Sequence, residues 1–269
     1  MVTPRKTKEK ASRIRFPEKT DELIPCSSCL PGKTQEERCN TQPTPILKWN
    51  HAKNKGTMYF HALIPYKPVN PKTRLAPVMT QEEREEFAEV MLGDVISAVR
   101  KTGCTATLLC TSKYTCSEAL VAIRKEGLNE AINWALPQFH CPALIIMSDL
   151  PMTTPGSLQR VLSTKADMAI VPGLGGGTNV IFVKHPETFH VEYYGFSYRR
   201  HLQIAEDLGL TVEIIDSMRM STDVDEPSDL VELMIHGHGN AREWLYEHGF
   251  ALSVENGRVS VTRNGEKIV

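Results

Sequence analysis

Short apolar runs alternate with longer amphipathic stretches from Met58 onward, and this alternation predicts both strands and helices. A short continuous apolar run is typical of a buried strand, whereas apolar residues at every third or fourth position indicate a helix. The expected strands are 58–66, 105–111, 142–148, 166–173, 177–184 and 211–217. The expected helices are 80–103, 157–163, 198–209 and 226–237, and one or two further helices with a short strand between them are expected around 117–139.

The order of these elements predicts an α/β fold with a mainly parallel central sheet that helices cover on both faces, a three-layer Rossmann-like arrangement. The first helix has a clear start, because Thr80 and Glu83 are spaced as a capping box, and Gly103 marks its end. At the C-terminus, Asn256-Gly257 stands between two alternating runs, which predicts a β-hairpin.

The first 57 residues differ in composition from the rest. They are rich in Lys, Arg, Thr and Pro and show little apolar periodicity, so a disordered extension is expected before one domain at 58–269. Within this extension, Cys26 and Cys29 form a CxxC pair that could bind zinc or act as a redox site with Cys39. Free thiols in a tail explain the same residues, and both interpretations stay open.

Composition limits the classes of function. The chain has 269 residues, of which 41% are hydrophobic and 23% charged, which is enough for a normal core. A formal net charge of -1 argues against a broad nucleic-acid surface. No apolar run is long enough to span a membrane, and the N-terminus lacks the apolar region of a signal peptide. A soluble cytoplasmic protein without nucleic-acid or membrane partners is therefore expected.

Acidic residues follow two of the expected strands. Asp149 comes directly after an apolar strand, and Asp223 and Asp225 alternate in the segment "STDVDEPSDL". Ligands of open α/β sheets bind at the carboxyl ends of strands, and alternate residues of an extended segment point to one side. Carboxylate oxygens suit Mg²⁺, with Mn²⁺ as an alternative. A helix cap at Asp149 and a solvated turn at 223–225 are the competing interpretations.

Two loops complete the candidate site. The segment "IPYKPVNPKTRLAP" offers Lys67, Lys72 and Arg74 on a chain that its prolines restrict, which suits phosphate binding as well as a solvated basic loop. The segment "GLGGGTNV" has glycines that let backbone amides approach a ligand, followed by Thr178 and Asn179. It lacks both the GxGxxG order and the P-loop lysine, which excludes a dinucleotide-binding or Walker site.

Taken together and in this order, "IPYKPVNPKTRLAP", "EGLNEAI", "SDLPMTTP", "GGTNVIF", "SYRRHLQIAEDLGL" and "STDVDEPSDL" resemble the 2-phospho-L-lactate guanylyltransferases of coenzyme F-420 biosynthesis. The resemblance covers 58 to about 240. It implies a GT-A-like nucleotidyltransferase fold related to that of the molybdenum-cofactor guanylyltransferases. It also implies transfer of GMP from GTP to 2-phospho-L-lactate, with methanogenic archaea as the expected source.

The resemblance assigns roles to the acidic and basic residues. By position, Asp149, Asp223 and Asp225 match the metal-binding aspartates, which would hold magnesium against the GTP phosphates. Lys72 matches the lysine that faces the acceptor phosphate. Lys67 and Arg74, which we place on the triphosphate and the leaving pyrophosphate, complete the catalytic set.

The acceptor pocket is matched less completely. Thr178 falls on the threonine of the family's "GTN", next to Asn179, and Ser197 falls on the serine of its usual "FGPGSFxxH". Here the chain reads "YYGFSYRRH" and departs from that pattern. The departure affects the alignment of Gly195, which is also expected to bind the acceptor, and with it the shape of the pocket. The expected partners are GTP, 2-phospho-L-lactate and the downstream 2-phospho-L-lactate transferase, with a homodimer left open.

Other functions remain open at this level. Relatives of the family accept phosphoenolpyruvate or 3-phosphoglycerate in the same reaction, and one short loop can supply the contacts that separate these acceptors. A GT-A glycosyltransferase would also use a D-x-D motif with a metal and a nucleotide sugar. A protein that binds the next enzyme of the pathway without catalysis is a third option. No residue that reads the guanine base can be named from spacing alone.

Overall fold

The computed structural model describes residues 60–255 and 257–268 of the chain. The predictions for residues 1–57, including the site at Cys26, Cys29 and Cys39, lie outside this range. No described helix has the length and hydropathy needed to cross a membrane.

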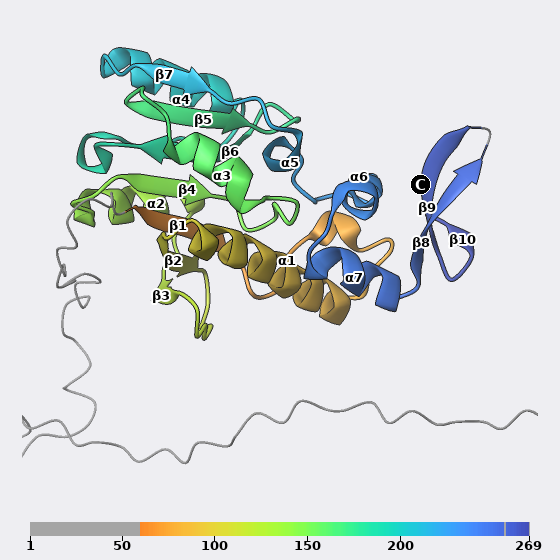
Figure 1. The fold of residues 1–269 in the computed structure, drawn as a ribbon. Coiled ribbons are helices and arrows are strands. Elements are labelled where there is room, and N and C mark those ends of the chain that lie inside the picture. The colour runs from red at the N-terminus through yellow and green to blue at the C-terminus, as the bar shows by residue number, and fades with distance from the viewer. Residues whose placement is uncertain (1–59, 256, 269) are drawn as a thin grey trace, which may run out of the picture. The chain divides into compact units, whose positions relative to one another are not determined.

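A seven-stranded sheet forms the centre of the fold, with the strand order β3-β2-β1-β4-β6-β5-β7 (Figure 1). Its strands are β1 (His61–Tyr66), β2 (Thr105–Cys110), β3 (Leu120–Ile123), β4 (Ala143–Ile146), β5 (Met168–Pro172), β6 (Thr178–Val183) and β7 (Val212–Ile214). Only β6 runs antiparallel to its two neighbours, and the other pairs are parallel. The prediction of a mainly parallel sheet is thus confirmed.

Two apolar layers cover the sheet, because successive residues of each strand point to opposite faces. In β1, Ala62 and Ile64 belong to the core on one face, whereas Leu63 belongs to the core on the other. The first face packs against α1 (Gln81–Lys101), α3 (Pro155–Leu162), α6 (Asp229–His236) and α7 (Asn240–Glu247). The second face packs against α2 (Leu128–Ala135) and α4 (Ser197–Asp207). The three-layer arrangement is confirmed.

The start of α1 follows the predicted capping box. The Thr80 side chain accepts a hydrogen bond from the Glu83 backbone at 3.2 Å, and the Glu83 carboxylate accepts one from the Thr80 backbone at 2.8 Å. These two bonds satisfy backbone donors that a helix otherwise leaves free in its first turn. Helix α1 therefore has a fixed N-terminus directly after the basic loop.

One element prediction was wrong in part, and one helix was missed. The stretch 117–139 holds the expected short strand, β3, and one helix, α2, but no helix precedes the strand, because parallel pairing with β2 outweighs the helical preference of the first residues. Helix α7 was not foreseen. Its N-terminus has only Gly239 as a local cap, and Asp94 of α1 supplies the missing acceptors for the backbone amides of Asn240 and Ala241 at 2.9 and 2.8 Å.

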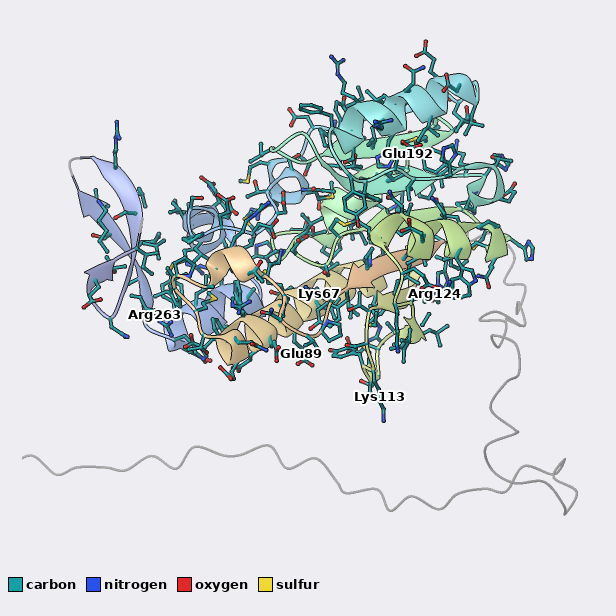
Figure 2. All side chains as sticks on the ribbon, turned by 180° about the vertical axis from the view of Figure 1, so that it is seen from behind. Lys67, Glu89, Lys113, Arg124, Glu192 and Arg263 are labelled. Atoms are coloured by element: carbon teal, nitrogen blue, oxygen red, sulfur yellow. The ribbon has the colours of Figure 1, made fainter. Side chains whose placement is uncertain are left out.

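The C-terminal segment forms a small antiparallel sheet of β8 (Phe250–Glu255), β9 (Arg258–Arg263) and β10 (Glu266–Lys267). The predicted hairpin is confirmed, and β10 adds a strand that was not predicted. Arg263, labelled in Figure 2, donates from Nη1 to the Val78 carbonyl at 2.6 Å and pairs with the Glu83 carboxylate. The short elements η2 (Thr73–Leu75), η3 (Leu136–Gln138), η4 (Pro186–Thr188) and α5 (Met218–Ser221) complete the described chain.

Candidate active site

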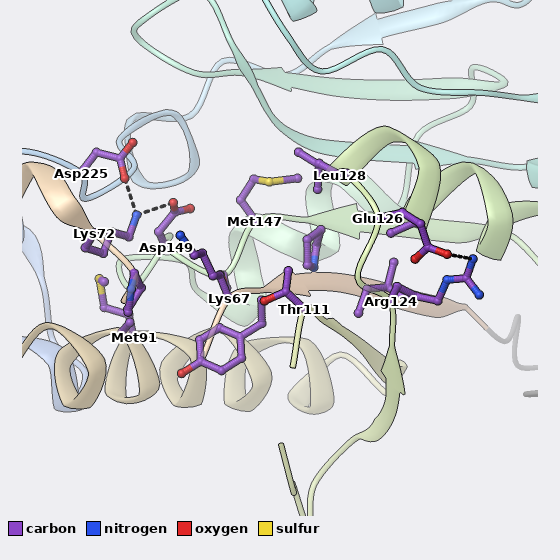
Figure 3. Close-up of a pocket in the computed structure, with 18 of the residues that line it drawn as sticks. Lys67, Lys72, Met91, Thr111, Arg124, Glu126, Leu128, Met147, Asp149 and Asp225 are labelled. Atoms are coloured by element: carbon purple, nitrogen blue, oxygen red, sulfur yellow. Dashed lines mark hydrogen bonds and ion pairs between the residues drawn. The ribbon is translucent and has the colours of Figure 1, made fainter. Parts of the chain in front are cut away.

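A cavity of about 420 Å³ opens at the carboxyl ends of β1, β2 and β4 (Figure 3). The loops that follow these strands supply Lys67, Lys72, Thr111 and Asp149, and the segment after α5 supplies Asp225. This volume lies in the range of small-molecule sites, about 300–1,000 Å³. The edge of the sheet that the sequence predicted is therefore hollowed and carries charged side chains.

An ionic cluster of Lys72, Asp149 and Asp225 lies at one end of the cavity. The Lys72 Nζ is 2.5 Å from the Asp149 Oδ2 and 2.5 Å from the Asp225 Oδ1. Burial lowers the pKa of the Lys72 ammonium, but the two carboxylates outweigh burial and raise this pKa above its ordinary value. Lys72 is therefore charged at neutral pH and joins the two acidic segments of the site.

The basic loop holds an unusual conformation because α1 fixes it. Asn70 and Lys72 both have left-handed backbone angles, with φ of 47° and 50°. Such angles are uncommon outside glycine and need support from neighbouring contacts. The buried Arg84 provides that support by donating from Nη1 to the Asn70 Oδ1 at 2.9 Å and to the Pro71 carbonyl at 2.5 Å. Arg84 was not predicted for the site. In the sequence it stands out only as a basic residue beside Glu82 and Glu83 in the first turn of α1.

The predicted aspartates lie on two segments that meet, although their side chains have different partners. A backbone hydrogen bond of 3.0 Å from Val224 to the Asp149 carbonyl joins the two acidic segments. Asp223 accepts a hydrogen bond from the Asn179 Nδ2 at 3.1 Å. Burial raises the pKa of the Asp223 carboxyl, and the negative charge of Asp149 raises it further. These carboxylates form a site that repels further negative charge and attracts a cation.

One carboxylate of the site has an oxygen available to a metal ion. Asp149 keeps one buried oxygen, Oδ1, without a hydrogen-bond partner, and unpaired carboxylate oxygens are the ligands that Mg²⁺ prefers. Within 60–255 and 257–268, however, no three His, Cys, Asp or Glu side chains already converge as a metal centre. The Lys72 ammonium is the cation between Asp149 and Asp225 in this structure.

The other two predicted cations lie near the same end. Arg74 is largely exposed, and its Nη1 is 3.6 Å from both the Asp225 Oδ2 and the Glu226 Oε1. Lys67 lines the cavity from the loop after β1 and is exposed. Lys67 can therefore contact an anion that enters the cavity, whereas Arg74 lies outside the cavity lining, beside Asp225.

The predicted acceptor residues form a separate, buried cluster. The Glu192 backbone amide donates to His201 Nε2 at 3.0 Å, so the neutral ring carries its proton on Nδ1 and donates to the Thr178 Oγ1 at 2.9 Å. Burial lowers the pKa of His201 to about 4, which keeps the ring neutral. Ser197 also donates to the Thr178 Oγ1, at 3.3 Å. Neither hydroxyl lines the cavity, so their contact with an acceptor stays a prediction.

Their loops nevertheless adjoin the site. Gly195 has φ of +73° and lies between Tyr194, which lines the cavity, and the exposed Phe196. A side chain at Gly173 would lie 2.6 Å from the Asn179 Oδ1, so glycine at this position lets Asn179 reach Asp223. Asn179 and Gly195 are thus next to residues of the site, although neither of them lines the cavity.

A second charged pair lies at the opposite end of the cavity. Arg124 and Glu126 follow β3, and the Arg124 Nη2 donates to the Glu126 Oε1 at 2.8 Å. The Arg124 guanidinium also lies over the Trp134 ring, 4.0 Å from its centroid. Neither residue was predicted for the site, although Glu126 begins the motif "EGLNEAI" and Arg124 stands two residues before it.

Comparison with known proteins shows the family of this chain. Residues 60–264 match the family described as "Guanylyl transferase CofC like". The 2-phospho-L-lactate guanylyltransferase of Methanocorpusculum labreanum is 86% identical over 212 residues, which are 79% of this chain and 100% of that relative. The enzyme of the same name from Methanoculleus marisnigri is 61% identical, over 77% of this chain and 97% of that relative.

The fold is also found among solved structures. A putative nucleotide-diphospho-sugar transferase from Desulfovibrio desulfuricans G20 superposes with a TM-score of 0.58 at 17% identity, covering 70% of this chain and 94% of that chain. At this level of identity the similarity concerns the fold alone. With the family match over the whole described sheet and the high identity of the relatives, the chain belongs to the CofC-like guanylyl transferases.

Proposed function

We propose that the protein transfers GMP from GTP to 2-phospho-L-lactate in coenzyme F-420 biosynthesis, giving lactyl-2-diphospho-5'-guanosine and pyrophosphate. The observation that carries this proposal is the cavity with the ionic cluster of Lys72, Asp149 and Asp225 at one end. The names of the relatives support the substrate, since two of them are 2-phospho-L-lactate guanylyltransferases at 86% and 61% identity.

The reaction needs positioning and charge neutralisation more than proton transfer. The second pKa of a phosphate monoester is about 6, so the acceptor phosphate is already an anionic nucleophile at neutral pH. One of its oxygens attacks the α-phosphorus of GTP, a new P–O bond forms, and the bond to the β-phosphate breaks to release pyrophosphate. This chemistry requires no general base, which agrees with the absence of a histidine among the residues that line the cavity.

The charged residues divide this work. Lys67 and Arg74 are exposed cations that we place on the triphosphate and on the leaving pyrophosphate. Lys72, held by the loop that Arg84 fixes, would orient the acceptor phosphate. Arg is suited to bidentate phosphate contacts, and Lys acts as a point charge.

The aspartates account for the requirement for a metal. Asp149, Asp223 and Asp225 would hold Mg²⁺, which neutralises phosphate charge when it is bound. The carboxylates repel a triphosphate, and the ion pairs with Lys72 and Arg74 balance the charges of Asp149 and Asp225 only in part. Thr178 and Ser197 would shape the acceptor side through His201 and the loop that carries Tyr194.

Pyrophosphate release tests the proposal. The protein is incubated with GTP and Mg²⁺ and with 2-phospho-L-lactate, phosphoenolpyruvate or 3-phosphoglycerate in separate reactions. The downstream 2-phospho-L-lactate transferase is added so that it consumes the product. Release that depends on 2-phospho-L-lactate and exceeds release with the other two acceptors is expected. A preference for phosphoenolpyruvate or 3-phosphoglycerate would make that compound the substrate in place of 2-phospho-L-lactate. If a folded protein released no pyrophosphate with any acceptor, the proposed reaction would be wrong.

A further inference from the structure

The end of the cavity opposite the ionic cluster carries one acidic side chain, Glu126 (Figure 3). The cavity is also lined by the apolar residues Leu109, Leu128 and Met147, and Figure 3 shows Leu128 and Met147 between the two ends. A nucleoside triphosphate has the same polarity, with a flat base at one end and phosphates at the other. If the phosphates lie at the Lys72 end, as the proposed function requires, the base lies at the Glu126 end.

Arg124 holds the Glu126 carboxylate in place. Its Nη2 donates to the Glu126 Oε1 at 2.8 Å, and its guanidinium lies 4.0 Å from the centroid of Trp134. The Arg124 backbone amide donates to the Cys110 carbonyl at 2.8 Å, which ties the start of the loop to the end of β2. Arg124 is thus a positioning residue that fixes one oxygen of the carboxylate.

The other oxygen of Glu126 is free to accept. Among the residues that the structure describes, no hydrogen bond to the Oε2 of Glu126 is formed, and the side chain is 47% exposed. An ionised carboxylate has about four lone-pair sites, so Oε1 can also accept a second bond beside Arg124. The cavity therefore presents a fixed pair of acceptors and no donor from this side chain.

We propose that Glu126 selects the nucleotide by binding the Watson–Crick edge of guanine, an inference that rests on the proposed use of GTP. Guanine offers two adjacent donors on this edge, N1–H and the 2-amino group, which match two carboxylate oxygens. Adenine and cytosine each present a ring nitrogen that would repel the carboxylate, and uracil presents one donor between two carbonyls. Leu109, Leu128 and Met147 form the apolar surroundings for the base.

Substitution of Glu126 by glutamine tests this assignment with GTP and xanthosine triphosphate. Xanthine keeps N1–H but has a carbonyl in place of the 2-amino group, so glutamine can accept from N1–H and donate to that carbonyl. The Glu126→Gln protein is expected to lose about tenfold to a hundredfold in kcat/KM for GTP, the scale of one bidentate base contact. It is also expected to use xanthosine triphosphate at least about tenfold better than the wild type does.

Glu130→Gln is the matched control. Glu130 lies four residues beyond Glu126, in the first turn of α2, is exposed, and does not line the cavity. This variant makes the same chemical change and is expected to keep the wild-type preference for GTP. An unchanged ratio of GTP to xanthosine triphosphate in Glu126→Gln would overturn the assignment.

Two further measurements separate this inference from the proposed function. The wild-type protein should prefer GTP over inosine triphosphate, which lacks only the 2-amino group, by about tenfold or more. If the wild-type protein used GTP and inosine triphosphate with equal kcat/KM, Glu126 would not read the 2-amino group, and this result would need no variant. Thermal shifts with each nucleotide and Mg²⁺ give the same comparison without an acceptor. Selective stabilisation by GTP with no turnover would contradict the proposed reaction and still support the assignment of Glu126.

Discussion

Two clusters of polar residues, each of which contains residues predicted from the sequence, differ in what they leave unpaired. In the ionic cluster, Lys72 bridges two carboxylates, yet Asp149 keeps a buried oxygen without a partner and the cluster lines the cavity. In the cluster of Thr178, Ser197 and His201, hydrogen bonds join the three side chains and all three are buried.

The difference separates residues that can bind a ligand from residues that hold the structure. A buried polar atom without a partner is costly, and a ligand or ion can remove that cost. A buried hydroxyl that already accepts from two donors has little capacity left for a ligand. The ionic cluster is therefore placed to act on substrates, whereas the buried cluster is placed to hold β6 against α4. Four predictions test this contrast.

The largest effect is expected at Asp149. Asp149→Asn keeps the shape of the side chain but removes the charge that binds a cation, so kcat should fall about a thousandfold, the scale of a lost electrostatic contact in an active site. The thermal midpoint should also fall, because Lys72 loses one of its two carboxylate partners and keeps only Asp225. The exposed Asp216 gives a control, because Asp216→Asn removes a charge outside the cavity and should retain activity. A folded, fully active Asp149→Asn protein would remove the ionic cluster from the site.

Lys72→Met should have the next largest effect, with kcat/KM for the acceptor lower by about a hundredfold or more. This scale is that of truncating a charged hydrogen-bonded partner. The variant leaves two carboxylates facing each other without the ammonium, so its thermal midpoint should be lower than that of the wild type. Added Mg²⁺ should raise the thermal midpoint of the variant more than that of the wild type. An equal response to Mg²⁺ in both proteins would mean that no cation replaces Lys72.

The buried cluster should make the protein sensitive to acid. The pKa of His201 is about 4 in the folded state against about 6.5 in an unfolded chain, so the unfolded state binds a proton that the folded state rejects. The stability that this difference contributes is fully present above pH 6.5 and is lost as the pH falls to about 4, where the loss reaches about 3 kcal/mol.

Denaturant unfolding at several pH values measures this loss. His61, whose pKa burial also lowers to about 4, contributes a second loss of the same sign. His201→Gln should therefore show a smaller dependence on pH between 6.5 and 4 than the wild type does. If the free energy of unfolding fell equally with pH in both proteins, His201 would accept a proton in the folded state.

The smallest effect is expected for Thr178→Val, which should lower the free energy of unfolding by about 1–2 kcal/mol. The substitution keeps the shape but removes the acceptor of the His201 Nδ1–H, which then lacks a buried partner. The KM for GTP should not change. A rise in the KM for 2-phospho-L-lactate with unchanged stability would give Thr178 a direct contact with the acceptor and would erase the contrast between the clusters.

The sequence could predict the layered fold because each part of that prediction depends on near neighbours. The capping box joins Thr80 to Glu83, three positions further along the chain, and it was found where it was expected. Helix α7 could not be predicted in this way, because the carboxylate that caps it, Asp94, lies 146 residues from Asn240 in the chain. Local patterns report local contacts, and a cap from another helix leaves no such pattern.

For the site, the sequence by itself determined which charged residues follow the strands: Lys67, Lys72 and Asp149 all stand in loops at the carboxyl edge of the sheet. Only the tertiary structure decided which of these charges meet. Lys72 contacts Asp149 across 77 residues and Asp225 across 153. The same packing buried Thr178 and placed Glu126, paired with Arg124, in the wall of the cavity. The physical reason is that burial and pairing are properties of the packed sheet and its loops, which bring distant residues together.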